Sequence, residues 1–300
     1  NRALSTEEIK RLYKIGATSK ISKTLQGRDS LTSGLVGHWT FDGPNMLTNV
    51  ADSSGQGNNG SLSHAGSGTT TVPGRVGQAL SFDDVNDYVN VTETSGVPVY
   101  GTTGYSVGFW VKAGVSAAES AIYGEGSGSS ANQRFHIRAL ASASTLSVNV
   151  RDDSAVNQVN SSSQGTVFNN AWHYIVWTDN NGTAKLYIDS QLDGQNFNYT
   201  PSTLTLNKVA IGALDRTSVS NYFGGLVDDV RLYNRVLSTA EISQLYQLGA
   251  TSKIAKTLPG RDSLKSGLVG WWTFDGPNML TNIADISGQS DTGLLILGAS

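Results

Sequence analysis

Short runs in which apolar and polar residues alternate with a period of two follow one another from residue 35 to residue 233. Alternation of this kind, rich in β-branched and aromatic residues, is typical of strands that bury one face. Turn signals separate the runs, including Asn-Asn-Gly at residues 58–60 and 180–182 and Asp-Gly at residues 193–194. The predicted strands are residues 35–42, 78–83, 88–92, 105–112, 134–140, 145–151, 172–178, 185–188, 208–212 and 225–233.

No helical pattern interrupts these strands, so we expect antiparallel pairing in two stacked sheets. The predicted fold class is therefore all-β. Aromatic side chains would supply much of the bulk between and around the sheets, although the sequence does not assign a face to each of them. These aromatic residues are Trp39, Phe41, Phe82, Tyr88, Phe109, Trp110, Trp172, Trp177, Tyr187 and Phe223.

On either side of this region, the spacing of the apolar residues changes from that of a strand to that of a helix. Ser238 is followed three residues later by Glu241, which is the capping-box pattern, and the same pattern opens residues 5–14. Apolar residues follow at helical spacing, and Gly16 and Gly249 stand where a left-handed C-cap belongs. Each copy predicts a short amphipathic helix of about three turns, whose apolar stripe docks on another surface.

The two helical segments belong to a longer internal repeat. Residues 1–60 return at residues 234–293 with 45 identities at a constant offset of 233, and the last seven aligned positions share only two. Within the repeat, 16 of the 19 positions of the connector at residues 249–267 match residues 16–34, which suits a packed connector as well as a recent duplication. The sequence is compatible with a recent duplication and with one period of a long tandem array.

Composition narrows the classes of function. Charged residues make up 15% and hydrophobic residues 38% of the chain, there are 34 glycines, and the net charge is −3. The chain lacks a basic footprint for nucleic acid or anionic membrane, and no apolar run is long enough for a membrane span. It has no cysteine, which excludes disulfides and thiolate sites and fits an exported bacterial protein. The missing start methionine and signal peptide suggest a fragment or a processed product.

Six segments occur in an order that resembles a known family: GLVGHWTFDG, ADSSGQGNNG, GQALSFDDVNDYV, YSVGFWVK, WHYIVWTDNNGTAKLYIDSQLDG and FGGLVDDVRLYNRVLSTAEISQLY. Together they resemble the concanavalin A-like, laminin G-type domain in its bacterial secreted form. The resemblance implies a jelly-roll sandwich of two curved antiparallel sheets with a short C-terminal capped helix. It also implies a carbohydrate-binding module, an adhesion domain or a passive spacer, often with a structural calcium ion. Fold alone does not decide among these functions.

The same resemblance predicts the domain organisation. Residues 1–16 would be the C-terminal helix of a preceding repeat, and residues 17–33 a connector. Residues 34–249 would be the laminin G-like sandwich, and residues 250–266 a second connector. Residues 267–300 would be the first strands of the next repeat.

Catalytic chemistry finds little support in the sequence. A retaining glycosidase needs two carboxyl groups about 5–5.5 Å apart, whereas the adjacent aspartates at residues 83–84, 152–153 and 228–229 would point to opposite faces of a strand. The four histidines are scattered without metal-binding spacing, and His38 is replaced by Trp271 in the second copy. We therefore expect no enzyme activity, no catalytic residue and no cofactor-binding residue.

Calcium is the metal that the sequence favours. Hard cations prefer the carboxylate and carbonyl oxygens that loops rich in Asp, Asn and Gly supply. Asp42 ends the first predicted strand, Asp52 opens a turn, and Asp228 and Asp229 lie in the last strand, which the resemblance pairs with the first. These four are the candidate ligands of a structural Ca²⁺, with Asp42 and one of the pair as the first choice. The alternative is that Asp52 caps a turn and Asp228 accepts backbone hydrogen bonds.

Sugar recognition would need an aromatic platform beside polar groups. Candidates lie in two predicted loops, residues 123–134 and 152–164, and near Tyr199 and Tyr222. The loops are rich in Ser, Gly and Asn and poor in aromatic residues, which is more typical of flexible linkers than of a preformed pocket.

The function predicted from the sequence is a structural or adhesive repeat unit of a long extracellular bacterial surface protein or fibre. The alternative is a carbohydrate-binding, lectin-like module of a larger secreted protein. The expected partners are neighbouring copies of the same repeat, joined head-to-tail by covalent linkage or by exchange of the strand near Trp271, and glycans. Neither nucleic acid nor an inserted membrane is an expected partner.

Overall fold

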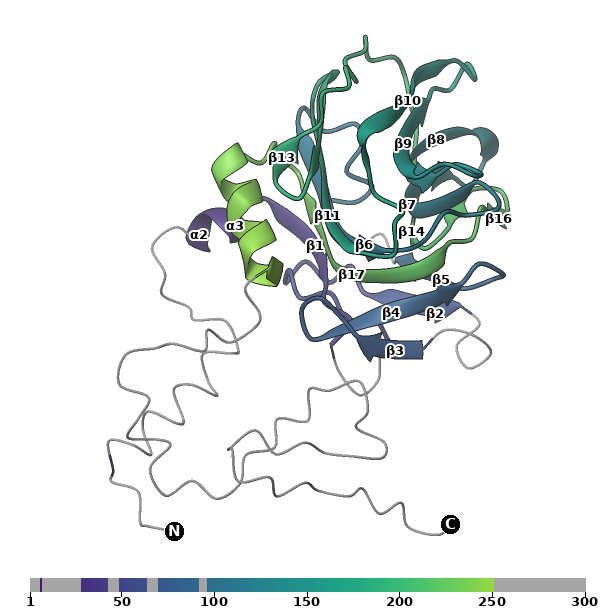
Figure 1. The fold of residues 1–300 in the computed structure, drawn as a ribbon. Coiled ribbons are helices and arrows are strands. Elements are labelled where there is room, and N and C mark those ends of the chain that lie inside the picture. The colour runs from purple at the N-terminus through teal and green to yellow at the C-terminus, as the bar shows by residue number, and fades with distance from the viewer. Residues whose placement is uncertain (1–5, 7–27, 43–48, 64–69, 92–95, 251–300) are drawn as a thin grey trace. The chain divides into compact units, whose positions relative to one another are not determined.

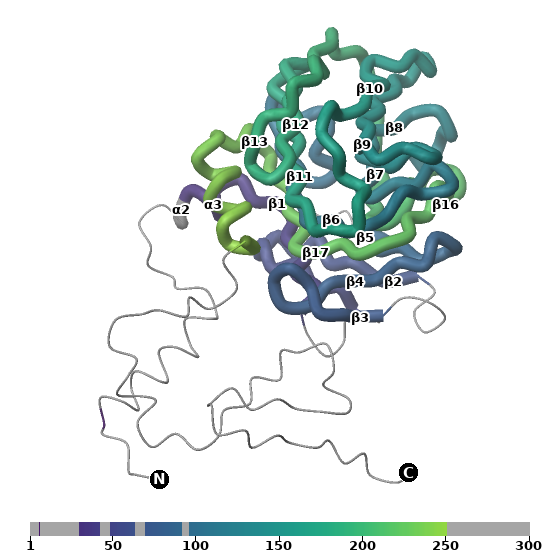
Figure 2. The backbone as a smooth tube through the Cα atoms, viewed as in Figure 1, coloured from purple at the N-terminus to yellow at the C-terminus, as the bar shows by residue number. Residues whose placement is uncertain are grey.

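The structure of the protein is a computed structural model, drawn as a ribbon in Figure 1 and as a backbone tube in Figure 2. Two predicted features, the helix at residues 5–14 apart from residue 6 and the strands at residues 267–300, lie outside the residues that the structure describes. Most of the described residues belong to a compact unit, Ser30–Ser252. The structure describes residue 6 and residues 28–42, 49–63, 70–91 and 96–250.

Sheet A, the larger of two stacked sheets, has eight antiparallel strands. Its central strands are almost wholly buried, because both of its faces are covered. β1 (Leu35–Trp39) pairs with β17 beside the main order of strands. That order is β13 (Gln191–Leu192), β12 (Thr183–Ile188), β11 (Trp172–Asn180), β6 (Tyr105–Lys112), β17 (Gly224–Tyr233), β4 (Gln78–Asp83) and β3 (Thr70–Pro73).

Sheet B has seven antiparallel strands, and a small hairpin lies on its outer face. Gly124 and Gly126 allow this contact, because a Cβ atom at either position would collide with the backbone of residues 213–215. The hairpin consists of β15 (Leu214–Asp215) and β16 (Val219–Ser220). The order of sheet B is β10 (Asn157–Thr166), β9 (Thr145–Arg151), β8 (Ser130–Ala139), β7 (Ser120–Ser127), β14 (Lys208–Ile211), β5 (Tyr88–Val91) and β2 (Gly60–Ser63).

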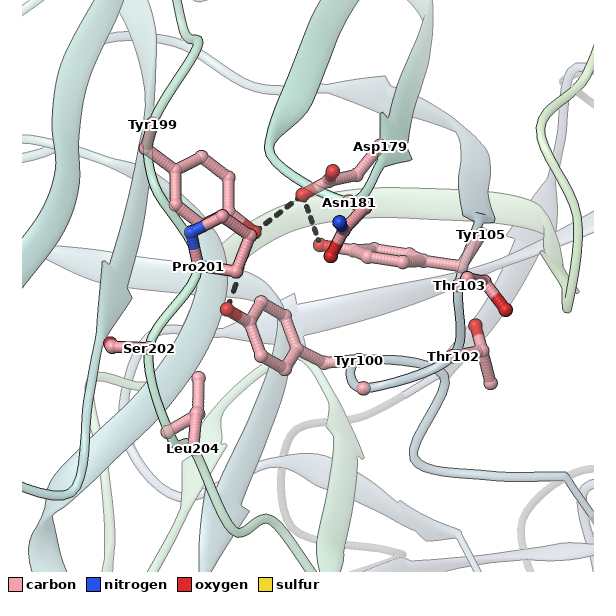
Figure 3. A pocket seen from close by; sticks show the side chains of 11 residues that line it. Tyr100, Thr102, Thr103, Tyr105, Asp179, Asn181, Tyr199, Pro201, Ser202 and Leu204 are labelled. Atoms are coloured by element: carbon pink, nitrogen blue, oxygen red, sulfur yellow. Dashed lines mark hydrogen bonds between the residues drawn. The ribbon is translucent and has the colours of Figure 1, made fainter.

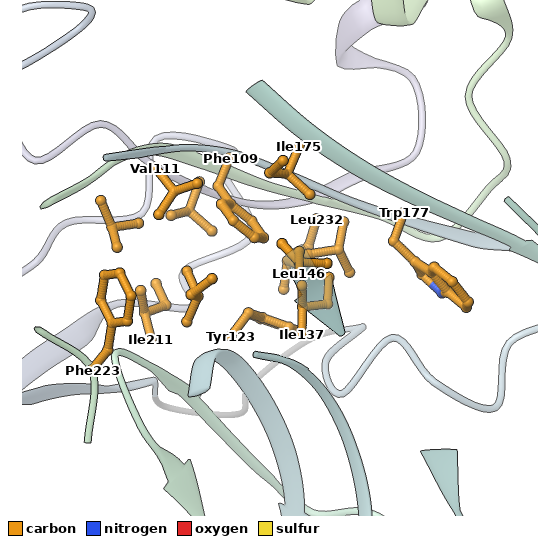
Figure 4. Close-up of a cluster of buried hydrophobic side chains, with 14 of the residues drawn as sticks. Phe109, Val111, Tyr123, Ile137, Leu146, Ile175, Trp177, Ile211, Phe223 and Leu232 are labelled. Carbon is orange, nitrogen blue, oxygen red and sulfur yellow. The ribbon is translucent and has the colours of Figure 1, made fainter. Parts of the chain in front are cut away.

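The main hydrophobic core lies between the two sheets. Alternate residues of β6 and β11, such as Phe109 and Trp177, face Tyr123, Ile137 and Ile211 of sheet B, as Figure 4 shows. All of these side chains are fully buried. Burial of this apolar surface is the main source of stability. The all-β fold with two antiparallel sheets is thus confirmed.

A second apolar cluster covers the outer face of sheet A. There α3 (Thr239–Ala250) and α2 (Arg28–Thr32) pack through Ile242, Leu245 and Leu31 onto Trp110 and other side chains of the sheet. The docking predicted for the apolar stripe of α3 is therefore present within its own domain. No helix in the described part of the chain is long and apolar enough to cross a membrane.

The capping box of α3 is present as predicted, but the role predicted for Gly249 is wrong. Ser238 N–H donates to Glu241 Oε2 (2.9 Å), and Glu241 N–H donates to Ser238 Oγ (3.3 Å). Gly249 lies inside the helix rather than at a left-handed cap. A Cβ atom there would lie 2.5 Å from the Trp110 indole, so the glycine allows the helix to approach the sheet. Tyr246 stacks on the same indole, with ring centroids 5.5 Å apart.

Two segments predicted as long loops are strands instead. β7 and the start of β8 occupy most of residues 123–134, and β10 occupies residues 157–164 of the second segment, 152–164. Sequence alternation missed them because β7 carries glycines under the hairpin, whereas β10 is an edge strand composed largely of Ser, Asn and Gln. The expectation that these segments are flexible linkers is therefore wrong. The predicted domain boundaries stay a prediction, although residues 30–33 of the predicted connector belong to the compact unit.

Candidate functional site

A pocket of about 370 Å³ lies at the end of the sandwich where three connections meet. They are the segment between β5 and β6, the turn between β11 and β12, and the segment between β13 and β14. We call it the tyrosine pocket, and Figure 3 shows its lining side chains. Its lining residues are Tyr100, Gly101, Thr102, Thr103, Tyr105, Asp179, Asn181, Tyr199, Pro201, Ser202 and Leu204.

Asp179 forms the polar base of the tyrosine pocket. It is 1% exposed, and its Oδ2 accepts hydrogen bonds from the hydroxyls of Tyr199 (2.6 Å) and Tyr105 (3.2 Å). Its Oδ1 accepts the N–H of Gly182 (2.7 Å) in the β11–β12 turn, where Asn181 and Gly182 both have positive φ. The predicted Asn-Asn-Gly turn therefore fixes this carboxylate in place.

The phenols around Asp179 form a chain of hydrogen bonds that leads outward. The Tyr100 and Tyr199 hydroxyl oxygens lie 3.3 Å apart, and since Tyr199 donates to Asp179, Tyr100 is the donor of this bond. Burial and then the Asp179 charge raise the pKa of Tyr199 far above its usual value. Burial likewise raises the pKa of Tyr105 and Tyr100. The phenols are therefore neutral and act as hydroxyl groups at physiological pH.

Glu125 fixes the backbone of one segment that lines the pocket. This fully buried side chain accepts the N–H groups of Val99 (2.9 Å) and Tyr100 (3.0 Å) and the hydroxyl of Tyr123 (2.6 Å). Burial raises the pKa of Glu125 to about 7 despite these hydrogen bonds. Glu125 therefore holds the backbone that carries Tyr100 into the pocket.

The lining suits a neutral polyhydroxylated ligand. Half-buried tyrosine rings, Pro201 and Leu204 provide apolar surface, and the exposed side chains of Thr103 and Asn181 provide polar groups at the mouth. Small-molecule sites combine such apolar walls with a few placed polar groups. Asp179 is the one acidic residue among the described residues that line the pocket, and its oxygens already accept three hydrogen bonds.

One sugar-binding candidate from the sequence, Tyr199, lies in this pocket, and another does not. Tyr222 packs against Tyr88 instead, with ring centroids 6.2 Å apart. Sequence reasoning missed Tyr100 and Asp179. The available signal for Asp179 was its position directly before a predicted hairpin turn, whereas Tyr100 carried no local signal.

Of the four predicted calcium ligands, Asp42 and Asp228 approach the same turn of the chain. Asp42 Oδ1 accepts the N–H of Gln78 (2.7 Å), and Asp228 Oδ2 accepts the N–H groups of Arg75 (2.7 Å) and Val76 (2.8 Å). Asp228 Oδ1 is buried without a hydrogen-bond partner. Burial raises the pKa of Asp42 and raises that of Asp228 to about 8, and the charges of Asp229 and, to a smaller extent, Asp42 add to the shift at Asp228.

The other two predicted ligands are committed elsewhere. Burial opposes the charge of Asp229, but Arg231 (3.0 Å) and His38 (2.6 Å) hold its pKa well below the usual range. Asp52 accepts four hydrogen bonds, from the N–H groups of His38, Ser54 and Asn58 and from the Ser54 hydroxyl. No group of three or more His, Cys, Asp or Glu residues in the described part is arranged to hold a metal. A cation here would therefore rely on Asp42, Asp228 and backbone carbonyls.

Comparison with solved structures finds the same fold in binding domains. Domain 4 of AbnA, an extracellular GH43 arabinanase from Geobacillus stearothermophilus solved in complex with arabinotriose, has a TM-score of 0.55 at 18% identity, over 72% of this chain and 99% of that one. The binding domain of Paraclostridial Mosquitocidal Protein 1 has a TM-score of 0.57 at 15% identity, over 72% and 52%. The botulinum neurotoxin serotype D binding domain has a TM-score of 0.56 at 14% identity, over 76% and 54%.

This chain thus spans about half the length of the two toxin binding domains. A comparison with curated proteins finds no match. The sequence model of a family does match, over residues 83–243, which run from the end of β4 into α3. This match covers more than half of the chain and agrees with the two-sheet fold. The protein belongs to the concanavalin A-like lectin/glucanases superfamily, as a laminin G-type domain.

Proposed function

We propose that this domain is a non-catalytic carbohydrate-binding module of an extracellular protein, and that the tyrosine pocket is its sugar subsite. The observation that carries the proposal is the hydrogen-bonded chain from buried Asp179 through Tyr199 to Tyr100 at the base of a 370 Å³ pocket. The arabinotriose complex of a domain with this fold supports the same ligand class.

The pocket favours binding over hydrolysis for a physical reason. A glycosidase needs one carboxyl group as a proton donor and a second nearby as a nucleophile or base. Asp179 instead accepts hydrogen bonds from two phenols and one N–H, and Glu125 is buried outside the pocket lining, where it accepts the N–H groups of residues 99 and 100. These carboxylates orient hydroxyl groups rather than face a scissile bond. The phenol O–H groups already donate within this network, so the phenol oxygens offer acceptor lone pairs to sugar hydroxyls.

Calorimetric titration with arabinotriose, cellotriose and maltotriose tests this function. We expect at least one trisaccharide to bind, and Tyr100→Phe and Asn181→Gly each to weaken binding by about tenfold, as expected for the loss of one hydrogen bond in a desolvated site. Glycine retains the positive φ of residue 181. Tyr222→Phe is the matched control outside the pocket. Absence of binding to all three sugars, or unchanged affinity in both pocket variants, would contradict the proposal.

A second proposal, that the domain is one repeat of a long surface protein or fibre, rests on the contacts that close the domain. Arg235, just before α3, donates to the carbonyls of Ser30 and Ser33 and pairs with Glu241 (2.8 Å). Leu31 packs beside Ile242 in the apolar cluster.

These closing residues recur in the sequence. Arg2, Glu8 and Ile9 correspond to Arg235, Glu241 and Ile242, and residues 263–266 correspond to Ser30–Ser33 except for one lysine. The sequence of the C-terminal half of the closing contact therefore occurs once more at residues 2–9, and that of the N-terminal half once more at residues 263–266. Light scattering of the 300-residue chain tests linkage by strand exchange, which predicts concentration-dependent association. A monomer with exchange-protected amides at residues 267–300 would contradict it.

We also propose that Asp42 and Asp228 hold a structural Ca²⁺. The buried and unpartnered Oδ1 of Asp228 fits a hard cation, and both carboxyl groups have raised pKa values that a cation would lower. A bound ion would link β17 to the segment after β1 and to the turn at residues 74–78. Asp229 and Asp52 would position neighbouring backbone rather than contact the ion.

A further inference from the structure

The outer face of sheet B carries a row of basic and amide side chains. In the β8–β9 register Arg134 lies opposite Arg151, His136 opposite Asn149, and Arg138 opposite Ser147. The intervening residues of both strands point into the core, so these six share the opposite face. Asn160 of β10 continues the row, because it lies opposite Asn149. β8, β9 and β10 lie side by side in Figure 1.

A fourth arginine comes from the hairpin that lies on this face. Arg216, between β15 and β16, donates to the carbonyl of Ala131 and to the Ser220 hydroxyl (2.9 Å). Its Nε is buried without a hydrogen-bond partner. We call Arg134, Arg138, Arg151 and Arg216 the arginine patch.

The arginine patch is short of negative charge. Glu119 pairs with Arg138 (2.8 Å), and among the described residues no ion pair forms to the other three arginines. The Nε of Arg134 donates to Asn149 Oδ1 (2.8 Å), and that of Arg151 to the carbonyl of Ala155 (2.9 Å), which are neutral acceptors. Glu119 also acts electrostatically on Arg134 and Arg216, so among the described residues one carboxylate serves three of the four arginines of the patch, and its ion pair is with Arg138.

This arrangement is unfavourable unless something compensates it. Like charges directly opposite each other on paired strands destabilise a sheet. Burial, followed by the charges of Arg151, Arg216 and Arg138, lowers the pKa of Arg134 to about 10. The chain as a whole carries a net charge of −3, so the positive charge of the arginine patch is opposite in sign to the net charge of the chain. A bound anion would relieve the repulsion and use the guanidinium N–H groups that face away from the core.

We propose that the arginine patch binds the acidic groups, carboxylate or sulfate, of an anionic polysaccharide. Guanidinium forks match the geometry of both groups, and the exposed amide of Asn160 beside them can bond sugar hydroxyls. A long nucleic acid needs an extended basic footprint, whereas the arginine patch is confined to four side chains on one face of sheet B. This site lies on a different face from the tyrosine pocket, and its ligand is charged rather than neutral.

The experiment compares acidic polymers with their neutral counterparts on the 300-residue chain. Dextran sulfate against dextran tests sulfate, and polygalacturonate against its methyl ester tests carboxylate. The test variant is Arg134→Gln with Arg151→Gln. The matched control is Lys112→Gln with Lys185→Gln, which removes the same charge from sheet A. Binding is measured by biolayer interferometry at two salt concentrations, and folding by thermal unfolding.

We expect at least one acidic polymer to bind, and to bind at least about tenfold more tightly than its neutral counterpart, as charge-assisted hydrogen bonds imply. The arginine double variant should lose most of this difference, whereas the lysine control keeps it. Equal binding of charged and neutral polymers, or equal loss in both double variants, would overturn the proposal. Equally tight binding of a single-stranded oligonucleotide would also overturn it, since it would reveal a non-selective polyanion surface. Tyr100→Phe should leave the binding of acidic polymers unchanged. This variant therefore distinguishes failure of the arginine-patch proposal from failure of the proposed sugar site in the tyrosine pocket.

Discussion

Two buried aspartates of sheet A, Asp179 and Asp228, illustrate opposite ways of placing a carboxyl group inside a protein. Asp179 accepts hydrogen bonds on both oxygens, from two phenols and one backbone N–H. Asp228 accepts two backbone N–H groups on Oδ2, while its Oδ1 is buried and unpartnered. Both oxygens of Asp179 therefore have hydrogen-bond donors among the described residues, whereas one oxygen of Asp228 has none.

This difference separates a scaffold from a binding site. A buried polar atom without a partner is costly, and it persists where a ligand completes it or where the group is protonated. Asp179 needs no external group, so its role is to hold the tyrosine hydroxyls around a pocket. Asp228 has a pKa of about 8, so it is mostly protonated at neutral pH unless a cation binds.

The largest expected effect comes from removing the satisfied carboxylate. Asp179→Ala leaves the hydroxyls of Tyr105 and Tyr199 and the N–H of Gly182 without their acceptor. Each unsatisfied buried donor costs roughly 1–3 kcal/mol, so we expect a loss of about 4 kcal/mol in the free energy of unfolding. Urea unfolding measures it. Asp83→Ala, at a half-buried aspartate whose side chain accepts the N–H of Val85, serves as the control. A loss no greater than that of the control would mean that the tyrosine network is not structural.

Glu125 is intermediate between Asp179 and Asp228: three donors contact its carboxyl group, yet its pKa is raised to about 7. Its effect on stability can therefore be tested by changing the pH. Its folded-state pKa exceeds the unfolded value of 4.5, so the folded state holds the proton more tightly. The resulting stability is present below pH 4.5 and is lost as the pH rises to 7, by about 3 kcal/mol for a fully buried group. Thermal and urea unfolding across this range measure the slope.

Glu125→Gln is the matched variant, since it keeps the shape of the protonated acid. We expect the variant to lack this part of the pH dependence, so that its stability relative to the native chain improves by about 3 kcal/mol between pH 4.5 and pH 7. Parallel pH profiles of the two proteins would show that Glu125 titrates normally.

Addition of calcium tests whether the unpartnered oxygen of Asp228 is a ligand of Ca²⁺. Binding at a concentration of about 100 Kd should raise the free energy of unfolding by about 2.7 kcal/mol, and a chelator should reverse it. Asp228→Asn should abolish the calcium effect and change stability little without calcium, because it replaces a largely neutral group. Asp52→Asn, at the turn outside the pair, should keep the calcium response. Thermal unfolding that calcium and chelator leave unchanged would reject the site.

The parts of the fold that the sequence predicted correctly are those set by local pattern. β4, β6 and β9 have the predicted ends, because each is a short run rich in apolar residues that is bounded by turn residues in the sequence. The capping box at Ser238 is likewise a contact between residues three apart. β7 escaped prediction because its glycines are required by a hairpin some ninety residues away in the chain, which no local pattern contains.

The candidate sites show the same limit. The tyrosine pocket joins Tyr100, Asp179 and Tyr199, whose proximity depends on the packing of three connections. For the aspartates at residues 228 and 229, strict alternation predicted opposite faces, but β17 has a bulge between Asp228 and Arg231, and Asp229 has a φ of 49°. The bulge buries both neighbours and gives them different partners. Which of the two is available to a cation could be seen only in three dimensions.

The smallest expected effect concerns a carboxylate satisfied near the surface, that of Glu241. Its pKa is lowered to about 2 because Arg235 and Ser238 outweigh its desolvation. Ser238→Ala removes the hydroxyl that donates to Glu241 and accepts the Glu241 N–H. Since water can replace these partners at an exposed helix end, we expect a loss of about 1 kcal/mol. Chemical denaturation measures it, with Ser202→Ala in a loop as the control. Hydrogen exchange should show faster opening of α3 while sheets A and B stay protected. Unchanged exchange in α3 would contradict this expectation, because it would mean that the packing of Ile242 and Leu245, rather than the cap, determines where the helix starts.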